Sequence, residues 1–387
     1  MFQPAASGRS SSPRAATSGP DGSGKRRLAG RRVLITGASS GVGLEAARRL
    51  AAEGARLALM ARGAEALEQI VAEERLDAVL LPVDLSNRPA VEEAVAIAVR
   101  ELGGLDVVVS NAAAAVFGHV SEVHPDDFDR TVAVTFTGAV NVIRAALPHL
   151  RASRGTIVAT GSLMASVPMP TWSSYTASKH ALRGFLNSLA IEEREQRSGV
   201  RVAMIHPGPI DSPLFAQASS ATGRQPRVPP DAYHPDVIAR ALVEVTIRPR
   251  REVLLGGETR LVGLLYALTR PVGERLLMVL DRWYRSGDEQ AARPGSLWTA
   301  PRRPQVSGGI PARDSLLARW QLGRRLCARG STPLDLAHHV VLAVRRGIHL
   351  RHRLVRPVSE TASPEHGLAI PKPGDADPPA TAGQVDL

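Results

Sequence analysis

Tyr175 and Lys179, in the segment SSYTASKHALRGF (residues 173–185), have side chains that could do chemistry together. Lys179 is one of only three lysines in a chain that otherwise uses arginine for its positive charge. If the segment is helical, residues four apart are neighbours on one face, so the phenol and the amine meet. That face continues as an apolar stripe of Leu182, Leu186 and Leu189. The stripe predicts that the pair points inward, where an ammonium group is costly unless something uses it.

A tyrosine beside a buried cation is suited to proton transfer. The ordinary pKa of a phenol, about 10, matches neutral pH poorly. A cation one helical turn away favours the phenolate and should lower the pKa of Tyr175. The pair then predicts a proton donor for an oxygen within hydrogen-bond reach. The structural alternative makes Tyr175 a core aromatic and extends the Lys179 amine to solvent, which the inward face makes awkward.

A glycine-rich loop follows the first β-branched run of the chain. The run RVLIT leads directly into TGASSGVG, with glycines at 37, 41 and 43 before a helical pattern. Glycines at this spacing permit a tight turn and let backbone N–H groups approach a diphosphate at the positive end of a helix dipole. The predicted dinucleotide-binding residues of this loop are Gly37, Ser39, Ser40, Gly41, Val42 and Gly43. In the other interpretation the glycines serve only to pack the helix on the strand.

The residues after the second and third predicted strands bear on which dinucleotide binds. An acidic residue after the second strand would bind the ribose 2′-hydroxyl of NAD, whereas arginine suits the 2′-phosphate of NADP. Ala61 stands where the acid would, and Arg62 follows, so NADP is favoured and NAD is the alternative. An ordinary solvated Arg62 is also possible. Asp84, with Leu85 beside it, is a candidate for the adenine amine or a structural turn former.

Short apolar runs alternate with helical patterns from residue 32 onward. The predicted strands are residues 32–36, 55–61, 78–83, 105–110, 155–160, 200–205 and 251–255. Helical patterns such as LEAARRLAAEG separate the first six, which is typical of βαβ units and a parallel sheet covered on both faces. We therefore expect an α/β fold, a doubly wound (Rossmann) parallel sheet over residues 31–257, with a helical C-terminal extension.

Composition excludes several other classes of site. The chain has 387 residues, is 44% hydrophobic and contains one cysteine, Cys327, which excludes an intrachain disulfide or a cysteine-built metal site. His119, His206 and His234 lack a metal-ligand spacing, so no metal is expected. No run reaches the roughly 18 apolar residues of a membrane-spanning helix, and the N-terminus lacks the apolar core of a secretory signal. Cytoplasmic is the default location.

The net charge of +11 comes mainly from the C-terminal part of the chain. The segments outside the sheet read as a disordered leader (1–30), a helical hairpin broken at Arg270-Pro271 with a linker (258–313), a basic helical extension (314–356) and a disordered tail (357–387). The basic amphipathic pattern within 314–356 predicts contact with a membrane surface or a partner protein. A solvated accessory helix is the plain alternative. Nucleic-acid binding is not expected, because no recognised module accompanies the arginines.

Taken in order, these motifs resemble the short-chain dehydrogenase/reductase family. The glycine loop comes first, followed by SNAA at residues 110–113, GSLMAS with Ser162, the Tyr175-x-x-x-Lys179 pair and HPGPIDSP after the sixth strand. The resemblance covers residues 31–257. It implies an oxidoreductase that moves a hydride between nicotinamide and a carbonyl or secondary alcohol, and Arg62 makes NADP the expected cofactor.

The resemblance also implies roles for individual residues. Tyr175 would donate the proton, Lys179 would also reach the nicotinamide ribose hydroxyls, and Ser162 would hold the substrate oxygen. Asn111 would support the cofactor and the neighbouring backbone. The residues expected to cover the nicotinamide after the proline-glycine turn are Pro207, Gly208, Ile210 and Ser212.

Two positions depart from the family's pattern. SNAA replaces the usual Asn-Asn-Ala-Gly, and Thr135 stands where the family has a catalytic asparagine that helps hold a water behind the lysine. The shorter threonine hydroxyl either replaces that amide in catalysis or leaves the relay incomplete. We expect that Thr135→Val lowers turnover without changing cofactor affinity.

The substrate is the least determined part of the prediction. Apolar residues near the motifs favour a lipophilic substrate, although core packing explains most of them equally well: Val116, Phe117, Met164, Val167, Met169, Trp172, Leu214 and Phe215. Residues 213–235 form a long loop that we interpret as a lid. The family makes a homo-oligomer the expectation. The alternative function is a nucleotide-binding scaffold or sensor with weak catalysis, whose basic tail recruits a partner or membrane.

Overall fold

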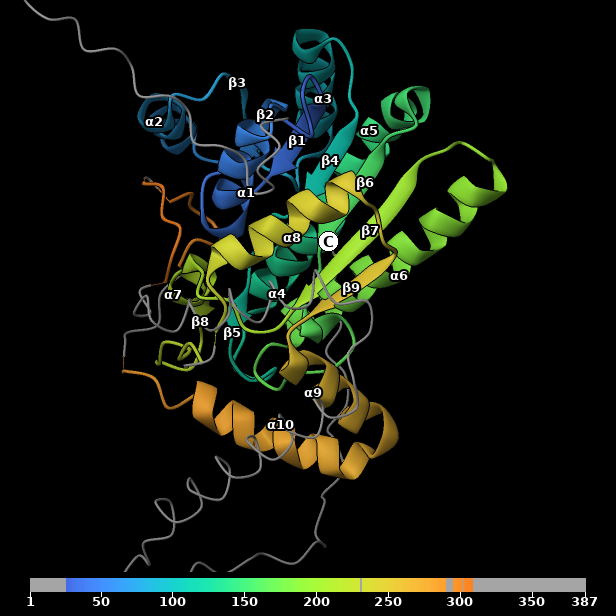
Figure 1. Cartoon of the computed structure of the whole chain (residues 1–387). Coiled ribbons are helices and arrows are strands. Elements are labelled where there is room, and N and C mark those ends of the chain that lie inside the picture. The colour runs from blue at the N-terminus through green and yellow to red at the C-terminus, as the bar shows by residue number, and fades with distance from the viewer. Residues whose placement is uncertain (1–25, 230–231, 290–294, 302, 309–387) are drawn as a thin grey trace, which may run out of the picture. The chain divides into compact units, whose positions relative to one another are not determined.

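A parallel sheet of seven strands runs through the described part of the chain (Figure 1). The computed structural model describes residues 26–229, 232–289, 295–301 and 303–308. The strands are β1 (Arg32–Thr36), β2 (Arg56–Ala61), β3 (Ala78–Pro82), β4 (Val107–Ser110), β6 (Thr156–Thr160), β7 (Arg201–Pro207) and β9 (Glu252–Leu255). They pair in the order β3-β2-β1-β4-β6-β7-β9, all parallel. Each corresponds to a predicted strand, so the doubly wound α/β fold is confirmed.

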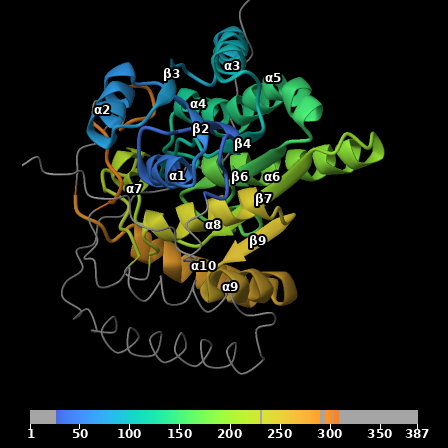
Figure 2. The ribbon, with the colours of Figure 1, turned by 45° about the horizontal axis from the view of Figure 1, so that its top comes forward.

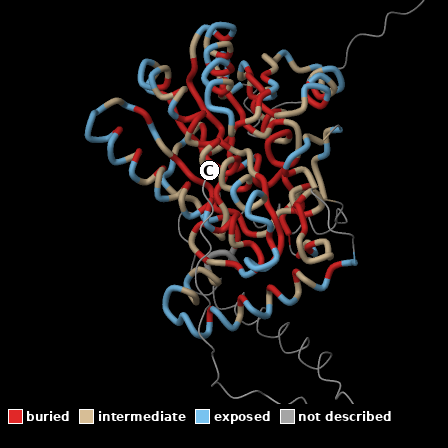
Figure 3. The backbone as a smooth tube through the Cα atoms, turned by 180° about the vertical axis from the view of Figure 1, so that it is seen from behind, coloured by how far each residue is buried: buried red, intermediate tan, exposed pale blue. Residues whose placement is uncertain are grey.

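Helices cover both faces of this sheet (Figure 2). The first face carries α1 (Gly41–Ala52), α2 (Ala64–Glu74) and α8 (Pro235–Ile247), and the second carries α3 (Arg88–Leu102), α5 (Gly138–Ser153) and α6 (Ser173–Glu195). Two apolar clusters, one on each face, join the helices to the strands. Figure 3 shows the buried residues, in red, gathered in the middle of the fold. The strands are apolar throughout because neither face meets water.

Local sequence signals account for where several helices begin and end. Helix α3 starts at Asn87, whose side chain accepts a hydrogen bond from the Ala90 N–H group, and it ends at Gly103 in the left-handed conformation. In α6 the predicted inward stripe of Leu182, Leu186 and Leu189 is buried. That burial orients the face on which Tyr175 and Lys179 lie.

Among the residues that the structure describes, one continuous helical stretch, Pro125–Ser153, is long and apolar enough to cross a membrane. It comprises α4 (Pro125–Val132), a π-helical turn η1 (Ala133–Thr137) and α5. Half of its apolar window is buried inside the fold, where α5 belongs to the core of the second sheet face. We therefore interpret this stretch as a core helix.

Smaller elements extend the fold beyond the carboxyl ends of the strands (Figure 1). They are β5 (Val116–Phe117), β8 (Ser219–Ser220), the 3₁₀ turn η2 (Leu163–Ala165), α7 (Pro213–Gln217), α9 (Gly257–Leu268) and α10 (Arg270–Tyr284). Strands β5 and β8 pair with each other, so the segment predicted to be a long loop begins with a short helix and a strand. The α9–α10 hairpin breaks at Thr269, one residue before the predicted position. The predictions for residues 1–25 and 309–387 fall outside the described residues.

Gly43 allows α1 to pack against the end of β1. A Cβ atom at Gly43 would lie 2.1 Å from the Gly37 carbonyl oxygen and 2.7 Å from the Asn111 side-chain nitrogen. Gly184 of α6 is exposed and has no atom within 4 Å of an added Cβ. The two glycines therefore form a matched pair, one constrained by packing and one not.

We expect Gly43→Ala to lower the free energy of unfolding by about 1–3 kcal/mol, because backbone atoms rather than a flexible side chain must move. Gly184→Ala should raise it by about 0.5–1 kcal/mol, because alanine favours an exposed helix interior. Urea denaturation of both variants measures the difference. Equal stability of the two would contradict the packing role of Gly43.

Candidate active site

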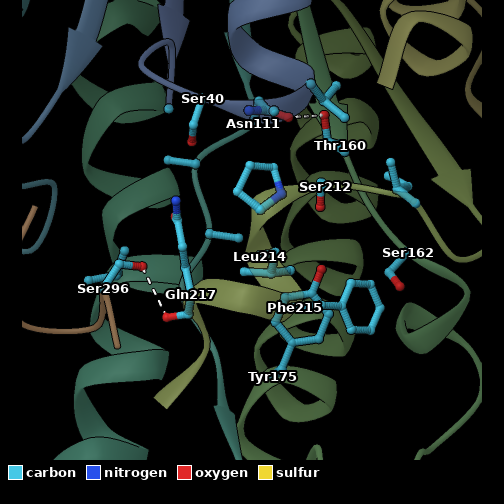
Figure 4. Close-up of a pocket in the computed structure, with 18 of the residues that line it drawn as sticks. Ser40, Asn111, Thr160, Ser162, Tyr175, Ser212, Leu214, Phe215, Gln217 and Ser296 are labelled. Carbon is cyan, nitrogen blue, oxygen red and sulfur yellow. Dashed lines mark hydrogen bonds between the residues drawn. The ribbon is translucent and has the colours of Figure 1, made fainter. Parts of the chain in front are cut away.

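A pocket at the carboxyl ends of the strands brings most of the predicted site residues together (Figure 4). Its volume is about 220 Å³. The predicted residues that line it are Gly37, Ser39, Ser40, Gly41, Val42, Arg62, Leu85, Asn111, Ser162, Tyr175, Lys179, Pro207, Gly208, Ile210 and Ser212. Gly43, Asp84 and Thr135 do not line it. The pocket joins the glycine-rich loop to the Tyr175–Lys179 pair.

Tyr175 and Lys179 are buried together on α6, as the sequence predicts. Their exposed fractions are 8% and 2%. The Lys179 Nζ atom lies 5.4 Å from the centroid of the Tyr175 ring and donates a hydrogen bond to the Thr160 carbonyl oxygen at 2.8 Å. The alternative in which the amine extends to solvent is therefore wrong. Thr160, at the end of β6, is a contributor that sequence reasoning missed.

The predicted lowering of the tyrosine pKa is wrong for the protein by itself. Burial raises the pKa of the Tyr175 phenol above its ordinary value, and the hydrogen bond with the Ser162 side chain only partly opposes this. Burial also lowers the pKa of Lys179 to about 8. Loss of water therefore outweighs the nearby cation, because desolvation disfavours the charged form of each group. The phenol is protonated at neutral pH.

Ser162 is fixed by two contacts at the start of η2. Its Oγ atom accepts a hydrogen bond from the Met164 N–H group at 3.1 Å. Its carbonyl oxygen accepts one from Nδ1 of His206 at 3.1 Å, and that histidine is only 1% exposed. The His206 Nε2 atom faces Glu252 at 3.9 Å. His206, one of the three histidines that lack a metal-ligand spacing, is a buried support for the Ser162 backbone.

Thr135 lies in the π-helical turn η1 and contacts backbone rather than the pocket. Its hydroxyl donates to the Ala114 carbonyl oxygen and accepts from the Ala114 N–H group, both at 2.9 Å. The side chain is completely buried. The hydroxyl therefore makes both of these hydrogen bonds with the backbone of a single residue, Ala114, which precedes β5. This geometry is that of a positioning residue, and it differs from the predicted place in a relay behind Lys179.

Asn111 joins three strand ends beneath the glycine-rich loop. The Asn111 and Ala112 N–H groups donate to Thr36 Oγ1 at 2.9 and 3.1 Å. The Thr160 hydroxyl donates to Asn111 Oδ1 at 3.1 Å (Figure 4). The ends of β1, β4 and β6 are thus held together, which fits the predicted support of neighbouring backbone. The threonines were not predicted because a hydroxyl at a strand end is an unspecific signal.

Arg62 is held by residues from far along the chain. We call residues 295–301 and 303–308 the strap. The Arg62 guanidinium donates to the carbonyl oxygens of Leu297, at 2.7 Å, and Ser296. Burial and the nearby Arg130 charge lower the pKa of Arg62 from its usual high value. Arg62 is therefore not an ordinary solvated arginine.

Asp84 forms an ion pair with Arg130 and accepts hydrogen bonds from the Ser86 N–H and hydroxyl groups at 3.0 and 2.8 Å. Burial raises the pKa of Asp84, but the hydrogen bonds from Arg130 and Ser86 prevail and hold it below its ordinary value. The predicted contact with an adenine amine would have to compete with this ion pair. Arg130 is a second cation near Arg62 that sequence reasoning missed.

Aromatic side chains surround Trp172 at the other end of the pocket. Its ring lies 5.2 Å from that of Phe117, 5.6 Å from that of Phe215 and 6.3 Å from that of Tyr284, between centroids. Tyr284 comes from α10 and stacks on Phe215 at 6.1 Å. The Thr171 hydroxyl anchors this helix through Asp281 at 2.6 Å. The sequence indicated a helix here but not which face it would turn toward the pocket.

The residues at the nucleotide end fit a dinucleotide. Gly37 and Gly41 have φ angles of +67° and +54°, and a Cβ at Gly37 would lie 2.8 Å from the Ala112 Cα atom. The loop is therefore built for close backbone approach at the start of α1. Arg62 adds a cation at the same end. Within the part of the chain that the structure describes, no group of three or more metal-ligating side chains gathers.

Comparison with known proteins agrees with this geometry. The profile of the short chain dehydrogenase family matches residues 31–223. The uncharacterized oxidoreductase YxnA of Bacillus subtilis (strain 168) is 32% identical over 258 residues, which are 65% of this chain and 72% of that protein.

Solved structures show the same fold. The alcohol dehydrogenase of the archaeon Thermococcus sibiricus, complexed with 5-hydroxy-NADP, is 28% identical with a TM-score of 0.52, over 58% of this chain and 95% of that one. The 3-ketoacyl-(acyl-carrier-protein) reductase of Brucella melitensis, complexed with NADH, is 26% identical with a TM-score of 0.53, over 59% and 97%. The chain belongs to the short-chain dehydrogenase/reductase family of oxidoreductases, which confirms the resemblance.

We expect Thr135→Val to lower the free energy of unfolding by at least about 1 kcal/mol, because it leaves the Ala114 N–H and C=O groups buried without their partner. It should also lower turnover, while NADPH affinity stays unchanged. Thr135→Ser keeps the hydroxyl and should behave like the wild type. Urea denaturation and steady-state kinetics test both variants. A valine variant that matches the serine variant would remove the hydroxyl from any positioning role.

The pKa of Lys179 predicts a pH dependence of stability. Folding lowers this pKa from 10.5 to about 8, so the unfolded chain binds more protons between these values. Stability therefore rises with pH in that window, and the cost of the buried charge is fully present below it. We expect the unfolding free energy of the wild type to gain about 1–2 kcal/mol over that of Lys179→Met between about pH 8 and about pH 9.5. A pH-independent difference would contradict the lowered pKa.

Proposed function

We propose that this protein is an NADP-dependent oxidoreductase that transfers a hydride between nicotinamide and a carbonyl or secondary alcohol of a lipophilic substrate. The observation that carries the proposal is the burial of Tyr175 and Lys179, beside Ser162, in a pocket that also reaches the glycine-rich loop. A proton donor and a dinucleotide site in one pocket meet the two needs of carbonyl reduction. Bound nicotinamide supplies or accepts the hydride.

Tyr175 is the proton donor in the direction of reduction. Its raised pKa keeps the phenol protonated at neutral pH. The substrate oxygen becomes more basic as negative charge develops on it, so it can take the phenol proton. The Lys179 ammonium group, 5.4 Å from the ring centroid, then stabilises the phenolate that remains. Ser162 helps to hold the substrate oxygen, since its hydroxyl proton can be donated while its oxygen accepts from Met164.

The preference for NADP rests on this chain's own residues, because one of the two structures described above is complexed with 5-hydroxy-NADP and the other with NADH. Arg62 lines the nucleotide end of the pocket, and Arg130 lies near enough to lower its pKa. Ala61 leaves no carboxylate at the end of β2 to bind a ribose 2′-hydroxyl. The Arg62 guanidinium favours a phosphate over a hydroxyl, because a phosphate is itself charged and can accept two of its N–H groups at once.

The lipophilic substrate class is supported by the aromatic end of the pocket. Met169, Trp172, Phe215 and Tyr284 all line the pocket and belong to one apolar cluster. The Trp172 indole N–H group is buried and has no hydrogen-bond partner among the described residues. A substrate with a flat apolar body and a second hydrogen-bond acceptor would match this wall.

We expect purified full-length protein to bind NADPH more tightly than NADH and to reduce members of a panel of aliphatic and aryl ketones. Tyr175→Phe should lower turnover by at least about a hundredfold, because it removes the proton donor, while binary NADPH binding is retained. Tyr266→Phe, which deletes a phenol hydroxyl on α9 outside the pocket lining, is the matched control.

Turnover that survives Tyr175→Phe would contradict the role given to the phenol. Cofactor binding without turnover of any ketone would favour the second candidate, a nucleotide-binding scaffold or sensor. The observation that favours this second candidate is that the Thr135 hydroxyl hydrogen-bonds to the Ala114 backbone.

A further inference from the structure

The strap, residues 295–301 and 303–308, lies along the nucleotide end of the pocket. Figure 2 shows this orange segment beside α2 and α7. Ser296, Ala300 and Pro301 line the pocket, and the Ser296 N–H group donates to the Gln217 carbonyl oxygen at 2.7 Å. The dashed line between Ser296 and Gln217 in Figure 4 marks a second hydrogen bond, from the Ser296 hydroxyl to the same carbonyl oxygen at 3.3 Å. The strap is thus part of the wall of a site that the rest of the fold builds for a dinucleotide.

A strap carbonyl occupies the start of α1. The Gly41 N–H group, on the first residue of that helix, donates to the Gln305 carbonyl oxygen at 2.8 Å, and Ser40 and Gln305 form a parallel β-bridge. N–H groups at a helix start are the donors that bind a phosphate in a dinucleotide site. In this structure an uncharged peptide oxygen takes the place that a phosphate oxygen would need.

Two further strap carbonyls accept hydrogen bonds from Arg62, the cation that favours NADP. The Arg62 guanidinium donates to the Ser296 and Leu297 carbonyl oxygens, and Arg130 Nε also donates to that of Leu297 at 3.3 Å. Phosphate is a stronger partner for arginine than a peptide oxygen, because both partners are then charged and the hydrogen bonds are often bidentate. A 2′-phosphate at Arg62 would therefore displace these contacts.

The space left beside the strap is small for a dinucleotide. The pocket measures about 220 Å³ with the strap in place. Pockets for drug-sized ligands are commonly about 300–1,000 Å³. The small volume and the strap hydrogen bonds therefore both indicate that the strap occupies space that a dinucleotide needs.

Side-chain contacts hold the strap at its two ends. Leu297 is buried in an apolar cluster with Val134, and the Trp298 Nε1–H group donates to Asp127 Oδ1 at 2.7 Å. At the other end the Ser307 hydroxyl donates to Asp211 Oδ2 at 2.5 Å. Trp298 is 49% exposed, whereas Leu297 beside it is 1% exposed, so the Trp298 contact is the more easily broken of the two.

We propose that the strap competes with the cofactor for the same groups. The strap occupies the phosphate-binding N–H groups until NADP displaces it. This inference rests on the proposed dinucleotide site. The apparent dissociation constant then equals the intrinsic one divided by the fraction of molecules with an open strap. If about one molecule in ten is open, full release of the strap tightens apparent binding about tenfold.

The test uses full-length variants that weaken each end separately. Trp298→Ala removes the contact with Asp127 and the stacking under Arg130, whose guanidinium carbon lies 5.3 Å from the indole centroid. Ser307→Ala removes the hydrogen bond to Asp211. Trp283→Ala is the matched control, because it removes a tryptophan of α10 that stacks on Arg227 at 5.0 Å and does not line the pocket. Calorimetric titration with NADPH and NADH measures binding.

We expect Trp298→Ala and Ser307→Ala to lower the dissociation constant of NADPH at least about threefold, and the double variant to lower it further, up to about tenfold. The dissociation constant of NADH should fall by the same factor, because the fraction of molecules with an open strap enters both constants alike. The control should match the wild type. Hydrogen exchange of residues 295–308 should become faster when NADPH binds.

Weaker or unchanged NADPH binding in the strap variants, or slower exchange of residues 295–308 with NADPH, would overturn the competition. Those outcomes would leave the proposed function intact, since the wild type would still bind NADPH. Absence of binding in the wild type and in every variant would instead contradict the proposed dinucleotide site, and the competition with it.

Discussion

The burial of the Lys179 amine against the Thr160 carbonyl oxygen is the constraint on which the rest of the site depends. An ammonium group with so little water is costly, so its neighbours must be fixed accurately. The Thr36, Asn111 and Thr160 hydrogen bonds provide this by joining the ends of β1, β4 and β6. The same network supports the backbone under the glycine-rich loop. The end of the pocket at Tyr175 and the end at the glycine-rich loop are therefore positioned by one set of polar contacts.

Much of the fold and part of the site could be predicted because their signals are local. Apolar runs of five to seven residues identified all seven strands of the main sheet, and glycine spacing located the loop before α1. The inward orientation of Tyr175 followed from the leucine stripe of the same helix. These features depend on residues within one or two turns of one another, which periodicity reports directly.

The remainder depends on contacts between distant residues, which periodicity does not report. Nothing near Tyr284 indicated that α10 turns it onto Phe215, and nothing near Gln305 indicated a bridge to Ser40. The predicted direction of the Tyr175 pKa shift was wrong for a similar reason. The sequence shows Lys179 four residues after Tyr175. The burial of the phenol, which decides whether its pKa rises or falls, depends on Trp172 and on elements across the fold.

The contact between Phe215 and Tyr284 has a consequence for how this protein can diverge. Tyr175 belongs to α6, whereas Phe215 belongs to α7 and Tyr284 to a helix beyond the last strand. Changes in the α9–α10 hairpin can therefore reshape molecular recognition while leaving the reacting groups in place. Exchanging that hairpin between relatives would be a modular route to new substrate ranges on an unchanged chemical framework.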